Sequence, residues 1–162
     1  GSGGDILIGN GGNDTLIAGA DEDDTSDTES NYLFGGLGAD SIVGAAGDDF
    51  ISGQLDDDIL TGNGGSDTFV FFGNSGDDII TDFGAEDTII IASSANGVDS
   101  FDDLNPRMVS GMLMLTLNQN SHIFLQGVTD LDASSVVIDN SGSAEIVDEL
   151  LALYDSLGLD FS

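Results

Sequence analysis

The feature that most constrains the fold is a nine-residue pattern that returns in register along the first half of the chain. The stretch GNGGNDTLI, from Gly9 to Ile17, is nearly repeated as GNGGSDTFV, from Gly62 to Val70. Aspartates are followed two positions later by Leu, Ile or Phe, and glycines crowd the positions before them. These aspartates are Asp5, Asp14, Asp40, Asp49, Asp58, Asp67, Asp78 and Asp87, and the apolar partners are Leu7, Leu16, Ile42, Ile51, Leu60, Phe69, Ile80 and Ile89. Such a period indicates a repeat architecture.

Each unit joins a turn to a strand of about three residues. Glycine supplies the positive φ angles that a tight corner needs. Because side chains alternate along a strand, the residue two positions after each aspartate points inward. Its neighbours point outward, and they are often hydroxylated: Thr15, Ser41, Ser52 and Thr61.

The charge balance limits the kinds of molecule that the chain can bind. Of 162 residues, 31 are Asp or Glu, Arg107 is the single basic residue, and the net charge is −30. Such a chain repels itself when compact and cannot neutralise a phosphate backbone, which excludes nucleic acid and disfavours anionic membranes. A disordered acidic chain would have few aromatics, but nine Phe and a regular Leu/Ile ladder are present. We therefore favour a fold that takes up metal cations.

Two further absences in the sequence restrict the chemistry. There are no cysteines, and hence no disulfides and no thiolate metal ligands. No apolar run approaches membrane-spanning length, so we expect no membrane insertion.

The repeated motif resembles the RTX, or haemolysin-type, calcium-binding nonapeptide G-G-x-G-x-D-x-U-x, over about residues 1–90. The resemblance implies an all-β fold, the right-handed parallel β-roll, in which two nonapeptides make one turn. Loops two repeats apart, such as those ending in Asp40 and Asp58, would then stack at about 4.8 Å. Calcium–oxygen distances are roughly 2.3–2.6 Å, so an ion between stacked loops would touch both. Magnesium is disfavoured because it demands near-ideal octahedra.

The family pattern also implies the calcium ligands, with several ions per chain. It assigns them to the aspartate side chain at the sixth position and to backbone carbonyls at the second and fourth positions. Carried onto this sequence, the ligands are Asn10, Gly12, Asp14; Gly36, Gly38, Asp40; Ala45, Gly47, Asp49; Gln54, Asp56, Asp58; and Asn63, Gly65, Asp67. Asp5, Asp78 and Asp87 extend the aspartate series at its two ends.

Two stretches depart from the pattern. Asp56 stands where glycine belongs, which predicts a strained or rearranged loop. Between about residues 18 and 30 the repeat lapses into acidic residues, which we interpret as a surface loop rather than a degenerate turn. An EF-hand starting at Asp21 fails, because Ser26 replaces the required glycine and Tyr32 the bidentate glutamate.

Residues 91–139 read as a β segment that caps the roll. Met112–Leu117 alternates, residues 118–120 form a turn and His122–Leu125 returns, which predicts a hairpin, and Ser134–Ile138 adds a strand. Residues 140–162 predict a linker and a short amphipathic C-terminal helix. The family resemblance implies that this tail is a type I secretion signal of a Gram-negative bacterium, although a helix packed on the domain is an equal alternative. The sequence begins in mid-pattern, so we expect a longer parent protein.

No catalytic constellation emerges. His122 is the only histidine, and its neighbour Ser121 would point to the opposite face of a strand, so we expect a structural histidine and no enzyme activity in this chain.

Two functions remain. The first is a calcium-binding module that folds outside the cell after type I secretion and stabilises its parent, which itself could be an enzyme. The second is a calcium-dependent adhesive module at the cell surface. It would present Thr15, Ser41, Ser52, Thr61 and Thr68 to a glycan, a surface ligand or ice, with Tyr32 and Phe50 as its aromatic candidates. The mixed outward residues disfavour ice.

Overall fold

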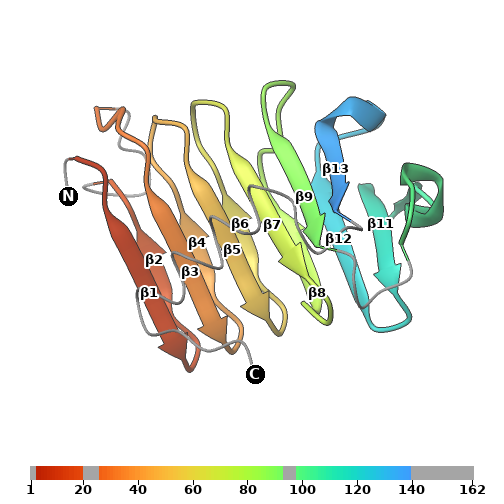
Figure 1. Ribbon diagram of the computed structural model, residues 1–162, viewed down its shortest axis with the longest axis horizontal. Helices are drawn as coiled ribbons and strands as arrows, with labels where there is room; N and C mark the ends of the chain where they lie inside the picture. The colour runs from red at the N-terminus through yellow and green to blue at the C-terminus, as the bar shows by residue number, and fades with distance from the viewer. Residues whose placement is uncertain (1–2, 20–25, 93–97, 140–162) are drawn as a thin grey trace.

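The computed structural model describes residues 3–19, 26–92 and 98–139, whose strands form two sheets (Figure 1). The first sheet is parallel throughout and has the order β1-β3-β5-β7-β9-β13. Its strands are β1 (Ile6–Gly11), β3 (Tyr32–Leu37), β5 (Phe50–Leu55), β7 (Thr68–Phe72), β9 (Thr88–Ala92) and β13 (Val136–Asp139).

The second sheet has the order β10-β11-β12-β8-β6-β4-β2. Its strands are β2 (Thr15–Ile17), β4 (Ser41–Val43), β6 (Ile59–Thr61), β8 (Asp77–Ile80), β10 (Arg107–Val109), β11 (Met112–Asn118) and β12 (Ser121–Gln126). From β1 to β9 the chain alternates between the two sheets, so one nonapeptide pair makes one turn. The predicted all-β parallel roll is therefore confirmed.

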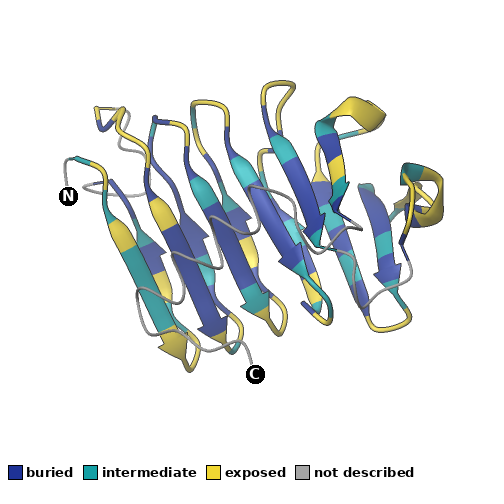
Figure 2. Ribbon diagram, viewed as in Figure 1, coloured by how far each residue is buried: buried dark blue, intermediate teal, exposed yellow. Residues whose placement is uncertain are grey.

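The core lies between the two sheets and is formed by the inward positions of the repeat. The residues two positions after the sixth-position Asp or Asn form one buried cluster, from Leu33, Ile51, Phe69 and Ile89 on one side to Leu16, Ile42, Leu60 and Ile80 on the other, and Leu7 packs against it. Figure 2 shows buried residues along the middle of the strands and exposed residues in the loops at their ends. The two extra residues Phe71 and Phe72 form the end of β7, and Phe71 is buried in the same core cluster as Phe69.

A second apolar cluster lies on the outer face of the first sheet. Phe34, Val70 and Ile90 are 0%, 1% and 2% exposed, and each follows an inward residue by one position. Ser52, which we expected to be presented at the surface, lies in the same row, is fully buried and donates a hydrogen bond to the Val70 carbonyl (3.0 Å).

The roll ends in an antiparallel segment. β12 pairs with β8 in parallel and with β11 in the antiparallel sense, so the predicted hairpin extends the second sheet, and β10 forms its edge. Leu115, Leu117 and Ile123 from this hairpin join the core, and the 3₁₀ helix η1 (Phe101–Leu104) adds the buried Leu104. A second 3₁₀ turn, η2 (Ala133–Ser135), leads into β13, where the sequence predicted a strand. The linker and helix predicted at 140–162 lie outside the described residues.

Candidate metal centres

The turns between strands stack along two edges of the roll. One edge joins β1 to β2, β3 to β4, β5 to β6 and β7 to β8, at the lower end of the strands in Figure 1. It carries Asp14, Asp40, Asp58 and Asp78 and is called the Asp58 edge here. The opposite edge carries Asp5, Asn31, Asp49, Asp67 and Asp87 and is called the Asp49 edge.

One oxygen of each stacked side chain is used by the fold itself. The backbone N–H of Asp14 donates to Oδ1 of Asp40, Asp40 to Asp58, and Asp58 to Asp78, over 2.8, 2.8 and 3.0 Å. The Asp49 edge repeats this arrangement through Asn31, Asp49, Asp67 and Asp87 at 2.8–3.0 Å. Sequence reasoning missed this role, in which the aspartate also fastens one turn to the next.

On the Asp58 edge the second carboxylate oxygen, Oδ2, differs from Oδ1 in its hydrogen bonding. Oδ2 of Asp14, Asp40, Asp58 and Asp78 is buried and has no hydrogen-bond donor. Burying an ionised carboxylate oxygen without a partner costs several kcal/mol. Each of these oxygens therefore requires a cation or a proton.

The pKa values of the buried carboxyl groups reflect this cost. Burial raises the pKa of Asp58 to about 7 and that of Asp78 to about 8, and repulsion between neighbouring aspartates adds to both shifts. Burial also raises the pKa of Asp40, and on the Asp49 edge it raises the pKa of Asp49 and brings that of Asp67 to about 7. Backbone N–H bonds to these groups oppose the shifts, because they stabilise the charged form.

Backbone carbonyls converge on the same gaps between loops. A Cβ on Gly36 would collide with the Asn10 carbonyl oxygen, and one on Gly38 would lie 2.5 Å from that of Gly12. The carbonyls at the second and fourth positions thus point at the next loop, as the ligand assignment requires. Within 3–19, 26–92 and 98–139, no three Asp, Glu or His side chains gather as a metal-binding group. A buried aspartate Oδ2 and nearby backbone carbonyls form an all-oxygen environment, which is the kind of environment that calcium prefers.

The backbone of the Asp58 edge follows the family pattern closely. Left-handed φ angles occur at the second position, in Asn10 (71°) and Gln54 (80°), and at the fourth position, in Gly12 (108°) and Gly38 (110°). Asp56 also has a positive φ of 75°, so of the two expectations for this loop, strained or rearranged, the loop is strained and keeps the glycine conformation. Its carboxylate accepts the backbone N–H of Gly38 (3.0 Å), which helps to hold Asp56 in this unfavourable region.

Two of the predicted ligands on the Asp49 edge, Asp49 and Ala45, have other partners. Oδ2 of Asp49 accepts the N–H of Ala45 (2.7 Å), and the Ala45 carbonyl accepts the N–H of Gly64 (3.1 Å). Asn63 and Gly65 have left-handed φ angles of 69° and 114°, but Ala45 and Gly47 do not. Asp82, which the sequence analysis did not single out, accepts the N–H groups of Gly62 and Asn63. The sequence signal for Asp82 is that it lies five residues before Asp87, at the first position of the same loop.

The acidic stretch expected to form a surface loop is partly built into this edge. Asp27 is 3% exposed and Asn31 is fully buried, and Asn31 occupies the sixth position of a loop running from Ser26. Residues 20–25 lie outside the described ranges. The expectation of a surface loop at 18–30 is therefore wrong for Asp27, whose Oδ1 accepts the N–H groups of Gly3 (3.4 Å) and Glu29 (3.3 Å).

His122 has a partner that the sequence analysis did not expect. Its Nδ1 lies 2.7 Å from Oδ1 of Asp77 on the neighbouring strand β8. Ser121, by contrast, is buried, and its Oγ accepts the N–H of Gly76 (3.3 Å). Ser121 and His122 are thus engaged separately, as predicted for adjacent strand residues.

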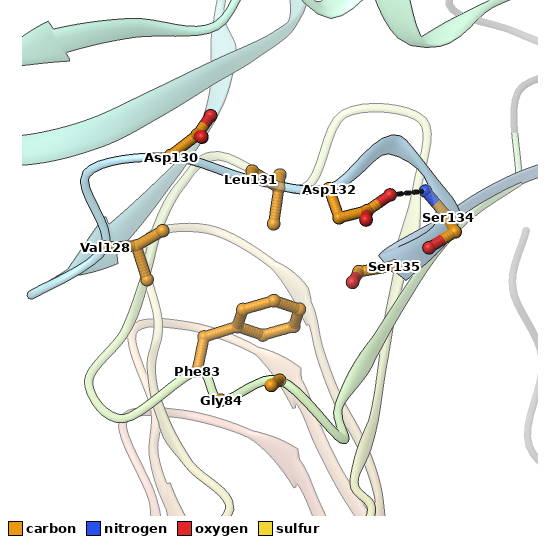
Figure 3. Close-up of a pocket in the computed structure, with 9 residues that line it drawn as sticks. Phe83, Gly84, Val128, Asp130, Leu131, Asp132, Ser134 and Ser135 are labelled. Atoms are coloured by element: carbon orange, nitrogen blue, oxygen red, sulfur yellow. Dashed lines mark hydrogen bonds between the residues drawn. The ribbon is translucent and has the colours of Figure 1, made fainter.

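A pocket at the cap end is lined by apolar side chains and by Asp130 and Asp132. It has a volume of about 360 Å³ and lies between the loop carrying Phe83 and Gly84 and the segment from Val128 to Ser135 (Figure 3). Val128 and Leu131 pack against the core, and Asp132 accepts the N–H of Ser134 (2.9 Å).

Among the described residues, no helix is long and apolar enough to cross a membrane.

The glycine at the first position of each loop makes room for the carboxylate, which gives a direct test of the site. A Cβ on Gly53 would collide with Oδ2 of Asp58 and lie 2.7 Å from its Cβ. We expect Gly53→Ala to lower calcium affinity about tenfold or more and to cost about 1–3 kcal/mol in the free energy of unfolding. Gly11→Ala is the control, because its Cβ would meet only Leu37 atoms at 3.8 Å or beyond. Equal calcium affinities for the two variants, measured by calorimetry, would contradict this geometry.

Comparison with known proteins agrees with the geometry. The family model described as RTX calcium-binding nonapeptide repeat (four copies) matches residues 1–25, 30–69 and 70–90. The crystal structure of the extracellular lipase LipA from Serratia marcescens is 28% identical and superposes with a TM-score of 0.58, covering 81% of this chain. The chain spans only 20% of that lipase. No curated protein matches. Stacked aspartate loops, converging carbonyls and the matching repeats together establish that the chain belongs to the RTX calcium-binding nonapeptide-repeat family.

Proposed function

We propose that this chain is a calcium-driven folding module of a secreted protein, which stays unfolded during export and closes into the roll outside the cell. In its folded form it would stabilise the parent protein. Extracellular calcium modules typically have affinities of about 10⁻⁴–10⁻³ M, far weaker than cytosolic calcium could saturate. Because the ions bind only the folded chain, they stabilise it by mass action once the chain reaches a calcium-rich medium.

The observation that carries this proposal is the row of buried, donorless Oδ2 atoms on the Asp58 edge. These atoms make the folded state unfavourable at neutral pH without cations. A calcium ion in each gap would be held by the carboxylates of Asp14, Asp40, Asp58 and Asp78 and by carbonyls such as those of Asn10 and Gly12. When bound, it supplies positive charge to a chain whose net charge is −30.

The location of the protein is supported by its relatives. RTX repeats occur in secreted proteins, and the similar solved structure is an extracellular lipase. The repeat module is a calcium-binding rather than a catalytic unit, so any enzyme activity would belong to other parts of the parent. We assign export to a Gram-negative type I secretion system, with 140–162 as the signal, on the family resemblance.

An adhesive role is the second candidate, and one observation favours it. Tyr32 is 40% exposed and lies beside Phe50 with ring centroids 5.9 Å apart, which offers a small aromatic surface for a sugar ring. The burial of Ser52 removes one of the hydroxyl groups expected at that surface.

An export assay in a Gram-negative host with a type I system tests the proposed function. We expect the full chain to be exported and the chain truncated after Asp139 to stay inside the cell. In calcium-containing medium the exported chain should resist protease, and in chelated medium it should be degraded, because the uncompensated carboxylates disfavour folding. Export of the truncated chain would contradict the assigned signal, and protease resistance in chelated medium would contradict calcium-driven folding.

A further inference from the structure

The two edges of the roll satisfy their second carboxylate oxygens by different means. On the Asp58 edge these oxygens lack donors at four successive loops. On the Asp49 edge, the gaps between the loops ending in Asn31, Asp49, Asp67 and Asp87 contain side-chain amides, a carboxylate and peptide N–H groups that pair with one another.

The first of these gaps is bridged by the side-chain amide of Asn31. Its Oδ1 accepts the N–H of Asp5 (2.9 Å), which fixes the orientation of the amide group. Its Nδ2 then donates both to the carbonyl of Glu29 (3.1 Å) and to Oδ1 of Asp49 (2.9 Å). Glu29 is the fourth position of its own loop, and Asp49 is the sixth position of the next. The fully buried NH₂ group therefore joins the two kinds of oxygen that a cation in this gap would join.

The second gap is closed mainly by the backbone. Oδ2 of Asp49 accepts the N–H of Ala45 (2.7 Å), so it is not available as an empty acceptor. The Gly44 carbonyl accepts Nδ2 of Asn63 (3.0 Å), and the Ala45 carbonyl accepts the N–H of Gly64. One predicted ligand carbonyl, that of Ala45, and one carboxylate oxygen, Oδ2 of Asp49, are thus hydrogen-bonded already, as is the Gly44 carbonyl.

The third gap is closed by a carboxylate that meets peptide N–H groups. Oδ1 and Oδ2 of Asp82 accept the N–H groups of Gly62 (3.0 Å) and Asn63 (2.8 Å). Oδ2 of Asp87 accepts the N–H of Gly84 (2.7 Å). The Oδ2 atom of Asp67, between them, is not among the buried oxygens that lack a donor.

One carboxylate on this edge does have a buried oxygen without a donor. It is Asp27, whose Oδ1 faces the N–H of Gly3 in the first loop. The Asp27 side chain therefore faces the first loop, whereas its backbone carbonyl accepts the N–H of Ala46 (2.8 Å) in the next loop.

We propose that the three gaps of the Asp49 edge from Asn31 to Asp87 are held together by their own hydrogen bonds and take up no calcium, whereas calcium fills the gaps between the four loops of the Asp58 edge. This rests on the proposed calcium-driven function. The roll then has one cation-dependent edge and one edge whose pairing is independent of metal. Asn31 acts as the substitute for an ion, because its amide supplies two donors without adding charge to a strongly acidic stack.

The positions of the ions can be tested directly on the unaltered chain. Crystals grown with calcium, measured at a wavelength where calcium scatters anomalously, should show peaks in the three gaps among Asp14, Asp40, Asp58 and Asp78. We expect no peak between the loops of Asn31, Asp49, Asp67 and Asp87. A peak in any of those gaps would overturn the inference, although calcium binding itself would stand. Absence of peaks on both edges would instead refute the proposed function.

A substitution tests the role of the amide in solution. Asn31→Asp removes the two donated hydrogen bonds and restores a carboxylate, so we expect it to bind one more calcium ion per chain than the unaltered protein. Asn105→Asp is the matched control, because it adds the same charge at an exposed position that follows the 3₁₀ helix η1 and belongs to neither row of stacked loops. Equilibrium dialysis with radioactive calcium gives the ratios. The same ratio for Asn31→Asp and the unaltered chain would count against the inference.

Discussion

Removal of calcium at neutral pH is expected to unfold the roll completely. The folded chain buries the Oδ2 atoms of Asp14, Asp40, Asp58 and Asp78 without donors, and it compacts a net charge of −30. Each site contributes about 2.7 kcal/mol when free calcium exceeds its dissociation constant a hundredfold. Three such sites supply about 8 kcal/mol, which is as large as the whole stability of a typical domain of about 5–15 kcal/mol.

Far-ultraviolet circular dichroism during a calcium titration measures this effect. We expect a coil spectrum in chelator and a cooperative change to a β spectrum as calcium is added. Magnesium at equal concentration is the control and should be much less effective, because flexible shells rich in carbonyls do not provide its octahedral geometry. A β spectrum that is unchanged in chelator would show that the fold does not depend on the cation.

Much of the fold could be predicted because the repeat encodes it locally. The repeat predicts that the residue two positions after each aspartate is buried. This rule correctly placed Ile51 and Phe69, which stack in the same row as Leu33, in the core. The alternation of Met112–Leu117 likewise predicted the capping hairpin. Both inferences depend only on the direction of successive side chains along a strand.

The difference between the two edges could not be predicted in the same way. It depends on hydrogen bonds between residues 18–20 positions apart, such as Asn31 to Asp49 and Gly62 to Asp82. The insertion before Asn31 hid its register, because it stands 17 residues after Asp14 but 18 before Asp49. The partner of His122 cannot be predicted from the sequence for a similar reason: Asp77, 45 residues away, meets it only through the pairing of β12 with β8.

Acid is expected to replace calcium in part and to fold the metal-free chain. In the folded state burial raises the pKa of Asp58 to about 7 and of Asp78 to about 8, against an unfolded value of 3.8. The folded chain therefore binds more protons than the unfolded chain between about pH 4 and pH 8. It follows that the stability which these groups contribute is present at the acid end of this range and is lost as the pH rises through 7 to 8.

The change is measured by circular dichroism of the metal-free chain between about pH 5 and pH 8. We expect β structure at the acid end and coil at the alkaline end. Asp58→Asn cannot titrate at this position and should keep its β structure to a higher pH than the unaltered chain, because the amide can still accept the N–H of Asp40 as Asn31 accepts that of Asp5. Asp102→Asn is the matched control, since it removes the same charge at an exposed position in the 3₁₀ helix η1, outside the stacked loops. If both variants lose structure at the same pH, the buried carboxylates do not govern folding, and the repulsion is a property of the whole charged chain.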